Sequence, residues 1–453
     1  MDNNLNKAFE LASKVKEKGG TAYFVGGYVR DKLLKTENKD IDIEVHGLTP
    51  TALEEILEEL GGKLSYGESF GIYGIKGCDI DIAMPRKEKL RGSGHKDFDV
   101  FVDPFIGTLK ASKRRDFTVN ALMQDVLTGE ITDHFGGVKD LENKHIRHIS
   151  DTTFIEDPLR VLRAAQFAAR FDFTVAEETV KLCSKMDITA LSKERILLEL
   201  EKALLKAQKP SVFFKIMADF KALGYWFPEL RALMGVKQNP KHHAEGDVWV
   251  HTMMVLDAAA KYREKAENPL GFMLAALCHD FGKAVTTEEI NGVIHAYGHE
   301  IKGIPLAKSF LQRITSETKL INYVLNLVKN HMRPNTVAGA KSSVKATNKM
   351  FFEAADPKAL IYIGLADGEG RIKEGADESK NGEFLFERLK IFNELMAIPY
   401  VIGRDLIDAG LKPNEDFTEL LNFAQKLRLS GVEKESALKQ VLAMAARLKK
   451  KKK

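Results

Sequence analysis

Two aspartates, Asp40 and Asp42, follow a paired glycine and an arginine in the stretch FVGGYVRDKLLKTENKDIDIEV, from Phe24 to Val45. Residues i and i+2 of a β-strand point to the same face, so both carboxylates can face one cleft. Mg²⁺ prefers oxygen ligands and commonly takes one or two carboxylates plus the phosphates of a substrate. Backbone N–H groups at a glycine turn that opens a helix can approach such phosphates closely. The stretch therefore predicts a magnesium and polyphosphate site; a glycine turn before a strand with solvent-facing acids is the alternative.

A second group of residues with metal-binding chemistry is rich in histidine. Its members are His251, His279, Asp280, His299, His331 and Asp367. Imidazole and carboxylate ligands suit transition metals, and these residue types leave Zn, Ni, Fe, Mn and Co open. Water bound to such a metal becomes nucleophilic near neutral pH and can hydrolyse phosphate mono- and cyclic diesters, while Lys283 could pair with the phosphate. A lone buried histidine is more often a core residue, and His242, His243 and His295 are assigned to the surface or to structural roles.

The elements that must position these residues differ along the chain. Up to about residue 145, alternating apolar and polar residues predict an α/β region. Its predicted strands cover residues 21–27, 40–45, 70–77, 78–84, 117–125 and 129–135, and its predicted helices cover residues 5–18 and 49–61. From Thr153 onward the periodicity is helical. Proline and glycine breaks indicate a boundary near residue 240, and a polar segment after Arg371 predicts a linker.

Length and composition limit the class of protein. A chain of 453 residues is expected to form two to four domains, and 44% hydrophobic with 29% charged residues is typical of a soluble globular protein. No apolar run approaches the roughly 20 residues that span a bilayer, so no membrane is expected as a partner. The three cysteines form no CxxC pair, which favours reduced thiols and a cytoplasmic location.

The net charge of +4 arises at the C-terminal end of the chain. The run of lysines at residues 449–453 contributes five positive charges, which leaves about −1 for the rest. The body of the chain is therefore not uniformly basic, and any site for a polyanion must come from local clusters such as Lys113–Arg115.

Five motifs occur in the same order as in class II tRNA nucleotidyltransferases, the CCA-adding enzymes. They are GGYVRD…DID, RRDFTVNA, DHFGGVKDL, EDPLRVLRAAQF and SKERILLEL. The segment PRKEKLRGSG…FDVFVDP…KRRDFTVNALMQD is especially similar to the bacterial CCA-adding enzymes that carry an HD domain. LCHDFGKA lies where those enzymes have their His-Asp pair, and the order of the ligands resembles the HD phosphohydrolase superfamily. The resemblance covers most of the chain, and bacterial poly(A) polymerases share the same head.

This resemblance implies four parts. They are an α/β, polymerase-β-like nucleotidyltransferase head, an all-α neck that reads the nucleotide and binds RNA, an HD-type helical domain and a helical tail. The predicted ranges are residues 1–145, 146–240, 241–370 and 371–453.

The resemblance also implies roles for single residues of the head and neck. Asp40 and Asp42 match the catalytic, Mg²⁺-binding pair, and Asp81 lies where such heads often have a third carboxylate. The positions that match contacts to the incoming nucleotide are Gly27, Arg30, Arg115 and Arg163. One departure is Gln166, where the HD-bearing relatives have arginine; the loss of a guanidinium there should weaken a triphosphate or base contact.

Asp157 and Arg160 match the pair that reads the base in one pocket that accepts both CTP and ATP. Cytosine and adenine present an amino donor beside an unprotonated ring nitrogen, whereas guanine and uracil present a carbonyl beside a ring N–H. A carboxylate accepts and a guanidinium donates, so this pair, spaced i, i+3 on one helix face, suits C and A and repels G and U. The alternative is that Asp157 caps the helix that Pro158 begins.

In the HD part, the resemblance implies a divalent transition metal, with Ni²⁺ or Mn²⁺ as the candidates, and Mg²⁺ is kept for the head. His299 and His331 could add a second metal. Met332 stands where relatives often have aspartate, which weakens the case for a further ligand beside His331.

The predicted function is template-independent addition of CCA to tRNA 3′ ends, with a metal-dependent phosphatase and 2′,3′-cyclic phosphodiesterase activity in the HD domain. The expected partners are the tRNA 3′ end, CTP and ATP, and a homodimer is the candidate assembly. Two alternatives stay open: a bacterial poly(A) polymerase, and an HD phosphohydrolase whose head only binds RNA. Gln166 leaves open whether the chain adds all of CCA or only part of it.

Overall fold

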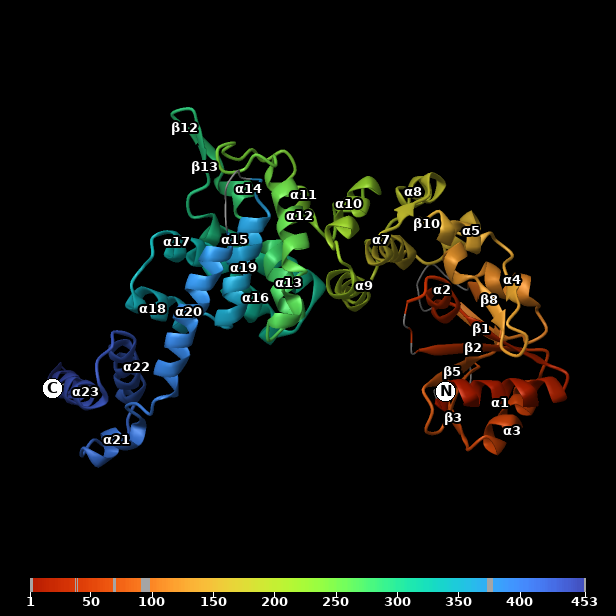
Figure 1. Cartoon of the computed structure of the whole chain (residues 1–453), viewed down its shortest axis with the longest axis horizontal. Coiled ribbons are helices and arrows are strands. Elements are labelled where there is room, and N and C mark those ends of the chain that lie inside the picture. The colour runs from red at the N-terminus through yellow and green to blue at the C-terminus, as the bar shows by residue number, and fades with distance from the viewer. Residues whose placement is uncertain are drawn as a thin grey trace. The chain divides into compact units, whose positions relative to one another are not determined.

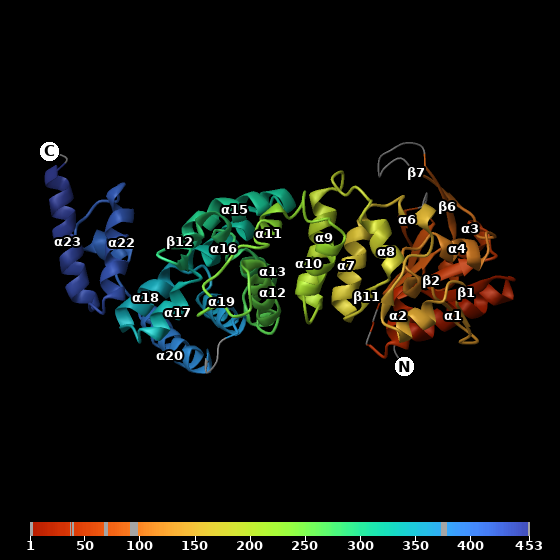
Figure 2. The ribbon, with the colours of Figure 1, turned by 90° about the horizontal axis from the view of Figure 1, so that it is seen from above.

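The computed structural model describes residues 3–451, apart from residues 37, 39, 68–70, 91–97 and 373–377. The chain forms two compact units (Figure 1 and Figure 2). Unit 1 comprises Met1–Ala207 with Val212–Tyr225, and unit 2 comprises Gln208–Ser211 with Trp226–Lys453. Of the helices in these described ranges, none is both long and apolar enough to cross a membrane.

Unit 1 is built on a seven-stranded mixed sheet with the order β3-β4-β5-β2-β1-β8-β9. Its strands are β1 (Thr21–Val25), β2 (Ile41–His46), β3 (Lys63–Gly67), β4 (Ile72–Ile75), β5 (Ile80–Ala83), β8 (Met123–Asp125) and β9 (Ile131–Thr132). β1 lies between β2 and β8 and is antiparallel to both. β2 runs parallel to β5, with Asp42 opposite Asp81. The predicted α/β head is confirmed, and each predicted strand segment contains a strand.

Other strands and one local conformation were not predicted. In unit 1, the described strands that the sequence analysis missed are β3, the antiparallel pair β6 (Arg86–Leu90) and β7 (Phe98–Val102), and the parallel pair β10 (His145–Ile146) and β11 (Thr174–Val175). Residues 117–125 do not form one strand, because a 3₁₀ turn, η2 (Thr118–Asn120), precedes β8. Thr118 Oγ1 donates to Asp140 at 2.7 Å, and a Cβ on Gly137 would lie 2.3 Å from the Thr118 carbonyl oxygen. This close packing of α5 (Gly137–Glu142) on η2 bends the segment.

The helices of unit 1 cover the sheet and then continue beyond it. α1 (Asn3–Glu17) and α3 (Pro50–Glu59) pack on each other and against the sheet (Figure 1). Thr49 Oγ1 accepts from Ala52 N and Pro50 is the first residue of α3, which together define its start. The remaining helices that begin in this part of the chain are α2 (Gly27–Leu33), α4 (Thr108–Lys113), α6 (Asp151–Phe154), α7 (Leu159–Phe171), α8 (Glu177–Cys183), α9 (Lys193–Lys206) and α10 (Ser211–Asp219).

Unit 2 is almost entirely helical. Its first helices are α11 (Pro228–Arg231), α12 (Val248–Ala259), η3 (Arg263–Lys265), α13 (Pro269–Cys278), α14 (Lys283–Thr286), α15 (His299–Ile314), α16 (Thr318–Asn330), α17 (Arg333–Gly339), α18 (Val344–Glu353), α19 (Pro357–Glu369) and α20 (Glu378–Ala397). Every residue of α13 from Gly271 to Cys278 is buried, as expected of a helix that is apolar on all sides. A short hairpin of β12 (Glu288–Ile290) and β13 (Val293–His295) interrupts the helices and was not predicted.

Three further helices, α21 (Gly403–Asp408), α22 (Asp416–Leu429) and α23 (Lys434–Lys451), follow α20, and all four lie within the range predicted as a helical tail. α22 and α23 run side by side in both views (Figure 1 and Figure 2). They share a small core with α21 that includes Leu406, Leu420, Ala424, Ala437 and Val441. The four predicted domain ranges stay predictions, because the division into two units leaves most of the predicted neck with the head.

Candidate functional site

The glycine bend between β1 and α2 brings backbone directly against charged side chains. Gly26 has φ 64° and ψ −126°, a combination that residues with a Cβ rarely adopt. A Cβ on Gly26 would lie 3.0 Å from Arg115 Nη1 and 3.8 Å from Asp42 Oδ2. Glycine at this position therefore leaves room for the arginine and the carboxylate to approach the turn.

Asp40 and Asp42 line the same cavity, of about 470 Å³, together with Gly26 and Gly27. Burial raises the pKa of Asp42 to about 6, and the negative charges of Asp81 and Asp40 also raise it, against the lowering effect of Arg115. A divalent cation held by Asp40 and Asp42 would relieve this repulsion; Asp81 does not line the cavity. Asp81 lies beside Asp42 in the sheet but is exposed, so it needs no buried partner.

Arg30, in α2, is the most deeply buried of the predicted nucleotide-binding arginines, at 4% exposed. Its Nε donates to Asp31 Oδ1 at 2.7 Å and its Nη1 donates to Asn120 Oδ1 at 2.6 Å. Its guanidinium carbon lies 4.5 Å from the ring centroid of Phe171 and 5.2 Å from that of Phe167. Burial lowers the pKa of Arg30, while the charge of Asp31 opposes that effect. The side chain is thus fixed in place before any ligand binds.

Arg163 and Arg115 approach the same cavity from α7 and from the segment after α4. Arg163 Nε donates to Asp116 Oδ2 at 2.7 Å, and Asp116 in turn accepts from the side chain of Asn120 at 2.9 Å. Arg115 lies 3.5 Å from Glu44 Oε2. The η2 turn therefore organises two predicted arginines at once, because Asn120 contacts Arg30 directly and Arg163 through Asp116.

The cavity in unit 1 carries more positive than negative side chains. The seven basic residues that line it are Arg30, Arg114, Arg115, Arg160, Arg163, Arg170 and Lys206, and the five acidic ones are Asp31, Asp40, Asp42, Asp116 and Asp157. The sequence analysis named Arg114 only as part of the basic cluster Lys113–Arg115, and it did not single out Arg170 and Lys206. Arg170 follows Arg163 by seven residues on α7, a helical spacing that could have identified it. An excess of guanidinium groups beside paired carboxylates suits a polyphosphate bound with a divalent cation.

Asp157 and Arg160 also line this cavity, but each already has protein partners. Asp157 Oδ1 accepts from Leu159 N at 3.1 Å, so it contacts the start of α7, although the N-cap position is Pro158 and not Asp157. Arg195 Nη2 binds both oxygens of Asp157, at 3.0 and 3.1 Å. Arg160 donates to the carbonyl oxygens of Thr153 and Arg114, at 2.5 and 2.7 Å. A nucleobase can therefore bind to Asp157 and Arg160 only if it shares these protein hydrogen bonds or replaces them.

Gln166 lies in the interior, at 1% exposed, and is not among the residues that line the cavity. Nothing in its position supports the expected loss of a triphosphate or base contact there, and that effect stays a prediction.

In unit 2, the six predicted metal ligands come together from five helices and their ends. His251 lies in α12, His279 and Asp280 follow α13, His299 begins α15, His331 follows α16 and Asp367 lies in α19. All six are buried. Their ligand atoms form two groups within which all atoms lie within 4.8 Å of one another, namely His251, His279 and Asp367, and Asp280, His299 and His331.

The hydrogen bonds of the histidine rings set which nitrogen faces the cluster. Three Nδ1 atoms donate to the main-chain carbonyl three residues earlier: His279 to Ala276 at 2.8 Å, His299 to Ala296 at 2.8 Å and His331 to Val328 at 2.7 Å. A carbonyl can only accept, so each Nδ1 carries a proton and each Nε2 is available as a ligand. His299 Nε2 and His331 Nε2 lie 3.2 Å apart. Two such nitrogens facing each other fit a shared cation.

Burial and charge support the same arrangement. Burial, together with the neighbouring charge of His279, lowers the pKa of His331 to about 3, so this ring is neutral, as a metal ligand must be. Although burial by itself raises the pKa of Asp280, the charges of His279 and Lys283 hold it well below its usual range. Asp280 is therefore a carboxylate near neutral pH. Met332, the departure noted in the sequence, lines the cavity beside this cluster.

Two residues that the sequence analysis did not assign to the cluster lie at its edge. Glu245 accepts from His243 Nδ1 at 2.8 Å, its Oε1 lies 2.9 Å from His251 Nδ1, and its side chain is fully buried. The carboxylate of Glu245 beside one ring nitrogen, and the 3.1 Å contact of His251 Nε2 with Asp367 Oδ1 on the other side, orient the ring of His251. His243 was expected at the surface or in a structural role, yet it lies in this group. No spacing rule links Glu245 to His251, because the two are joined through a loop before α12.

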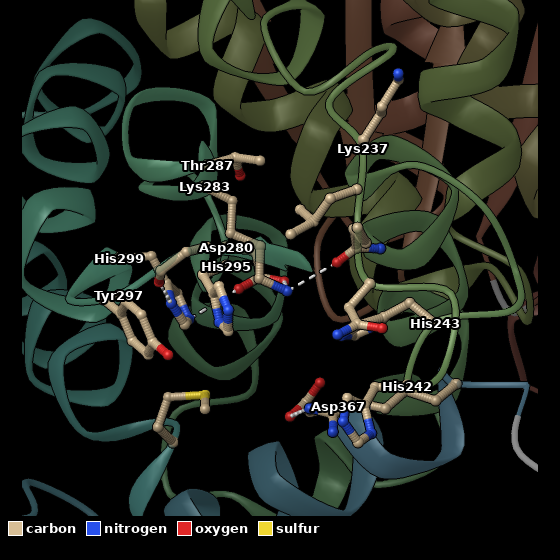
Figure 3. A pocket seen from close by; sticks show the side chains of 16 residues that line it. Lys237, His242, His243, Asp280, Lys283, Thr287, His295, Tyr297, His299 and Asp367 are labelled. Carbon is tan, nitrogen blue, oxygen red and sulfur yellow. Dashed lines mark hydrogen bonds and ion pairs between the residues drawn. The ribbon is translucent and has the colours of Figure 1, made fainter. Parts of the chain in front are cut away.

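A cavity of about 310 Å³ opens beside the cluster (Figure 3). Its lining includes Asp280, His299 and Asp367 of the cluster and the cations of Lys283 and Arg371. Lys283 Nζ lies 2.7 Å from Asp280 Oδ2 and donates to Gln238 Oε1 at 2.8 Å. A buried cluster of imidazoles and carboxylates that opens to a cavity with cations can present a metal-bound water to a phosphate ester.

Three family models match the chain. One is described as "Poly A polymerase head domain" and matches residues 22–147. One is described as "Probable RNA and SrmB- binding site of polymerase A" and matches residues 172–234. One is described as "HD domain" and matches residues 248–369.

Among curated proteins, the chain is similar to multifunctional CCA proteins. It is 38% identical over 330 residues to the Multifunctional CCA protein of Actinobacillus pleuropneumoniae serotype 5b (strain L20), covering 70% of this chain and 78% of that protein. It is 36% identical over 377 residues to the Multifunctional CCA protein of Pasteurella multocida (strain Pm70), covering 81% and 87%.

Among solved structures, the fold is that of CCA-adding enzymes. The Bacillus stearothermophilus CCA-adding enzyme in complex with CTP matches with a TM-score of 0.68 and 21% identity over 100% of both chains. The Thermotoga maritima CCA-adding enzyme complexed with tRNA_CCA matches with a TM-score of 0.62 and 22% identity over 98% of this chain and 96% of that chain.

Proposed function

The chain belongs to the family of multifunctional CCA proteins and is a nucleotidyltransferase with an HD domain; we propose that it adds C, C and A to tRNA 3′ ends. CTP and ATP are the nucleotide substrates, and pyrophosphate is released. The observation that carries this proposal is that Asp40 and Asp42 share one cavity with the glycine bend at Gly26 and Gly27 and with seven basic residues.

In the proposed reaction, Asp40 and Asp42 hold the divalent cation, which we take to be Mg²⁺. When bound, Mg²⁺ would lower the pKa of the terminal RNA hydroxyl and offset the charge of the triphosphate. The backbone at Gly27 and the guanidinium groups of Arg115 and Arg163 bind the phosphates. Because Arg30 and Arg163 are already held by Asp31 and by Asp116, little reorganisation is needed when the nucleotide arrives.

We assign base selection to Asp157 and Arg160. The carboxylate accepts from the amino group of cytosine or adenine, and the guanidinium donates to the adjacent ring nitrogen. Guanine and uracil present the opposite pattern and would leave both groups unpaired, which is costly in a partly buried site. In this scheme Asp157 keeps its contact with Arg195 and accepts from the base with its remaining lone pairs, and Arg160 shares its donors between the base and the main-chain carbonyls.

We propose that unit 2 is a metal-dependent phosphatase and 2′,3′-cyclic phosphodiesterase that trims damaged tRNA ends before repair. The cluster would hold a divalent transition metal, with Ni²⁺ or Mn²⁺ as the candidates, which supplies a nucleophilic water near neutral pH. Hydrolysis would form a bond from a water oxygen to phosphorus and break the bond from phosphorus to a ribose oxygen, which would take up a proton of that water. Glu245 keeps His251 oriented, and Lys283 binds the phosphate.

Sequencing the RNA ends made from tRNA that lacks CCA tests the proposal for unit 1. With CTP and ATP together, the expected product ends in CCA, and with CTP alone it ends in CC. Long A tails without any use of CTP would favour a poly(A) polymerase instead. Product that stops after one or two nucleotides with both substrates present would show partial addition. A homodimer stays a prediction, which sedimentation of the purified protein would test.

A further inference from the structure

Two aromatic rings form a stacked pair at the cavity of unit 2. The ring centroids of His295 and Tyr297 lie 4.8 Å apart, with only 14° between the ring planes. Both residues line the cavity that also contains Asp280 and Lys283 (Figure 3). Tyr297 is 69% exposed, so most of its surface is open to a ligand. His295 was expected at the surface or in a structural role, and its place in this cavity was not foreseen.

The β12–β13 hairpin holds this pair in position. Asn291 and Gly292 connect its strands with φ angles of 50° and 76°. Two central residues with positive φ are typical of the tight hairpin turn whose twist matches that of the strands. His295 is the last residue of β13 and pairs with Glu288 of β12. The ring of His295 therefore projects from a defined strand end.

The same short segment reaches the metal-binding cluster. Ala296, between the two aromatic residues, accepts a hydrogen bond from His299 Nδ1 at 2.8 Å. His299 Nε2 lies 3.3 Å from Asp280 Oδ1. The stacked rings and the cluster thus share one backbone segment and one cavity, so a ligand on the rings would have its polar end near the cluster.

The chemistry of the cavity suits a phosphate attached to a flat base. Lys237, Lys283 and Arg371 supply positive charge on its lining. The pair of His295 and Tyr297 supplies an aromatic face on which any nucleobase can stack. An aromatic face and a set of cations in one cavity are the two elements by which proteins hold single-stranded nucleotides.

We propose that His295 and Tyr297 form a stacking platform for the base of the nucleotide whose phosphate is hydrolysed at the cluster. This inference rests on the phosphohydrolase activity proposed for unit 2. The ligand is a nucleoside phosphate, either free or at the end of an RNA. Stacking should be tolerant of base identity and should act on binding of the substrate, with little effect on the bond-breaking step.

Tyr297→Ala tests the platform, with Tyr297→Phe as the variant that keeps the ring. Tyr297→Ala should weaken binding of adenosine 3′-monophosphate and raise its KM about 5- to 150-fold, the range measured for loss of one stacked base. Tyr297→Phe should stay close to wild type. Phe352→Ala is the matched control, because Phe352 is an exposed aromatic residue of unit 2, 44% exposed, that does not line the cavity.

Two ligands that lack a base show whether Tyr297→Ala affects binding of the base or affects hydrolysis of the phosphate. Binding of inorganic phosphate and hydrolysis of glycerol 2-phosphate should be the same in wild type and Tyr297→Ala. If wild type hydrolyses neither glycerol 2-phosphate nor a nucleotide, the proposed activity fails, and calorimetric binding of adenosine 3′-monophosphate still decides the platform. If Tyr297→Ala weakens binding equally for ligands with and without a base, or does not weaken binding of the nucleotide, the proposed stacking platform is overturned.

An RNA that ends in a 3′-phosphate distinguishes the two sources of the nucleotide. Equal effects of Tyr297→Ala on this RNA and on the mononucleotide support a site for the terminal base. An effect on the RNA alone would place a different base on the rings and would overturn the assignment.

Discussion

Arg195 Nη2 binds both carboxylate oxygens of Asp157, at 3.0 and 3.1 Å. The two side chains are 35% and 31% exposed, so the pair contributes little to stability, about 0–1 kcal/mol. Its effect is instead to fix the orientation of the carboxylate that we assign to base selection. The contact also makes Arg195 a positioning residue that the sequence analysis did not identify.

Arg195→Gln should therefore loosen nucleotide selection more than it lowers stability. We expect kcat/KM for CTP and ATP to fall about 10-fold, the loss of roughly 1.4 kcal/mol of oriented interaction, and misaddition of UTP and GTP to rise. Single-nucleotide addition assays and thermal melting measure the two effects. An unchanged ratio of correct to incorrect addition would remove Asp157 and Arg195 from base selection.

Gly26→Ala should impair nucleotide addition. The new Cβ would lie 3.0 Å from Arg115 Nη1 and the residue would be held at φ 64°. We expect at least a 10-fold lower addition rate, since displacement of a positioned group by about 1 Å costs up to about 100-fold. Gly129→Ala is the control, because Gly129 has φ 75° in an exposed turn outside the cavity. Equal losses in both variants would show that backbone strain alone is responsible.

Gly282→Ala should disrupt the metal-binding cluster of unit 2 without affecting unit 1. A Cβ on Gly282 would lie 2.0 Å from the main-chain oxygen of His299, so His299 must move. We expect the metal content of protein loaded with Ni²⁺ or Mn²⁺, measured by mass spectrometry, to fall at least about 10-fold. Gly339→Ala, where no atom lies within 4 Å, should keep its metal. Full metal loading of Gly282→Ala would contradict His299 as a ligand.

Asp116→Asn should destabilise unit 1 and make it less sensitive to acid. Burial by itself raises the pKa of Asp116, but the charge of Arg163 and the hydrogen bonds from Asn120 and Arg163 lower it overall. A lowered pKa gives stability that is complete above the unfolded-state pKa of about 3.9 and is lost as the pH falls further. The variant should lose about 1–3 kcal/mol near neutral pH. Denaturant melts at pH 7 and below pH 4 measure this, and parallel pH curves for both proteins would contradict it.

The sequence predicted the features that depend on local spacing. The i, i+2 spacing of Asp40 and Asp42 predicted two carboxylates that share a cleft, and the structure places both in one cavity. The order of the histidines, through the resemblance to HD enzymes, predicted a set that the fold brings together. Asn291-Gly292 is a strong hairpin signal between two β-like runs, so the hairpin could have been predicted from the sequence alone.

Features that depend on long-range packing could not be predicted in this way. Glu245 contacts His251 because a loop folds back on α12, and Arg195 reaches Asp157 from a different helix. The segment around Thr118 has the apolar pattern of a strand, but packing against α5 bends it. Tertiary contacts outweigh local preference in such segments.

The central claim is that Asp40 and Asp42 serve nucleotide addition at a site distinct from the histidine cluster. The most direct measurement compares Asp42→Asn and His279→Ala in two assays, CMP addition to tRNA that lacks CCA and hydrolysis of a phosphate monoester. Asp42→Asn should lose at least about 100-fold in addition, as expected for a group that organises transition-state charge, and keep hydrolysis. His279→Ala should lose hydrolysis and keep addition. Addition at the wild-type rate by Asp42→Asn, or loss of both activities in either folded variant, would contradict this account.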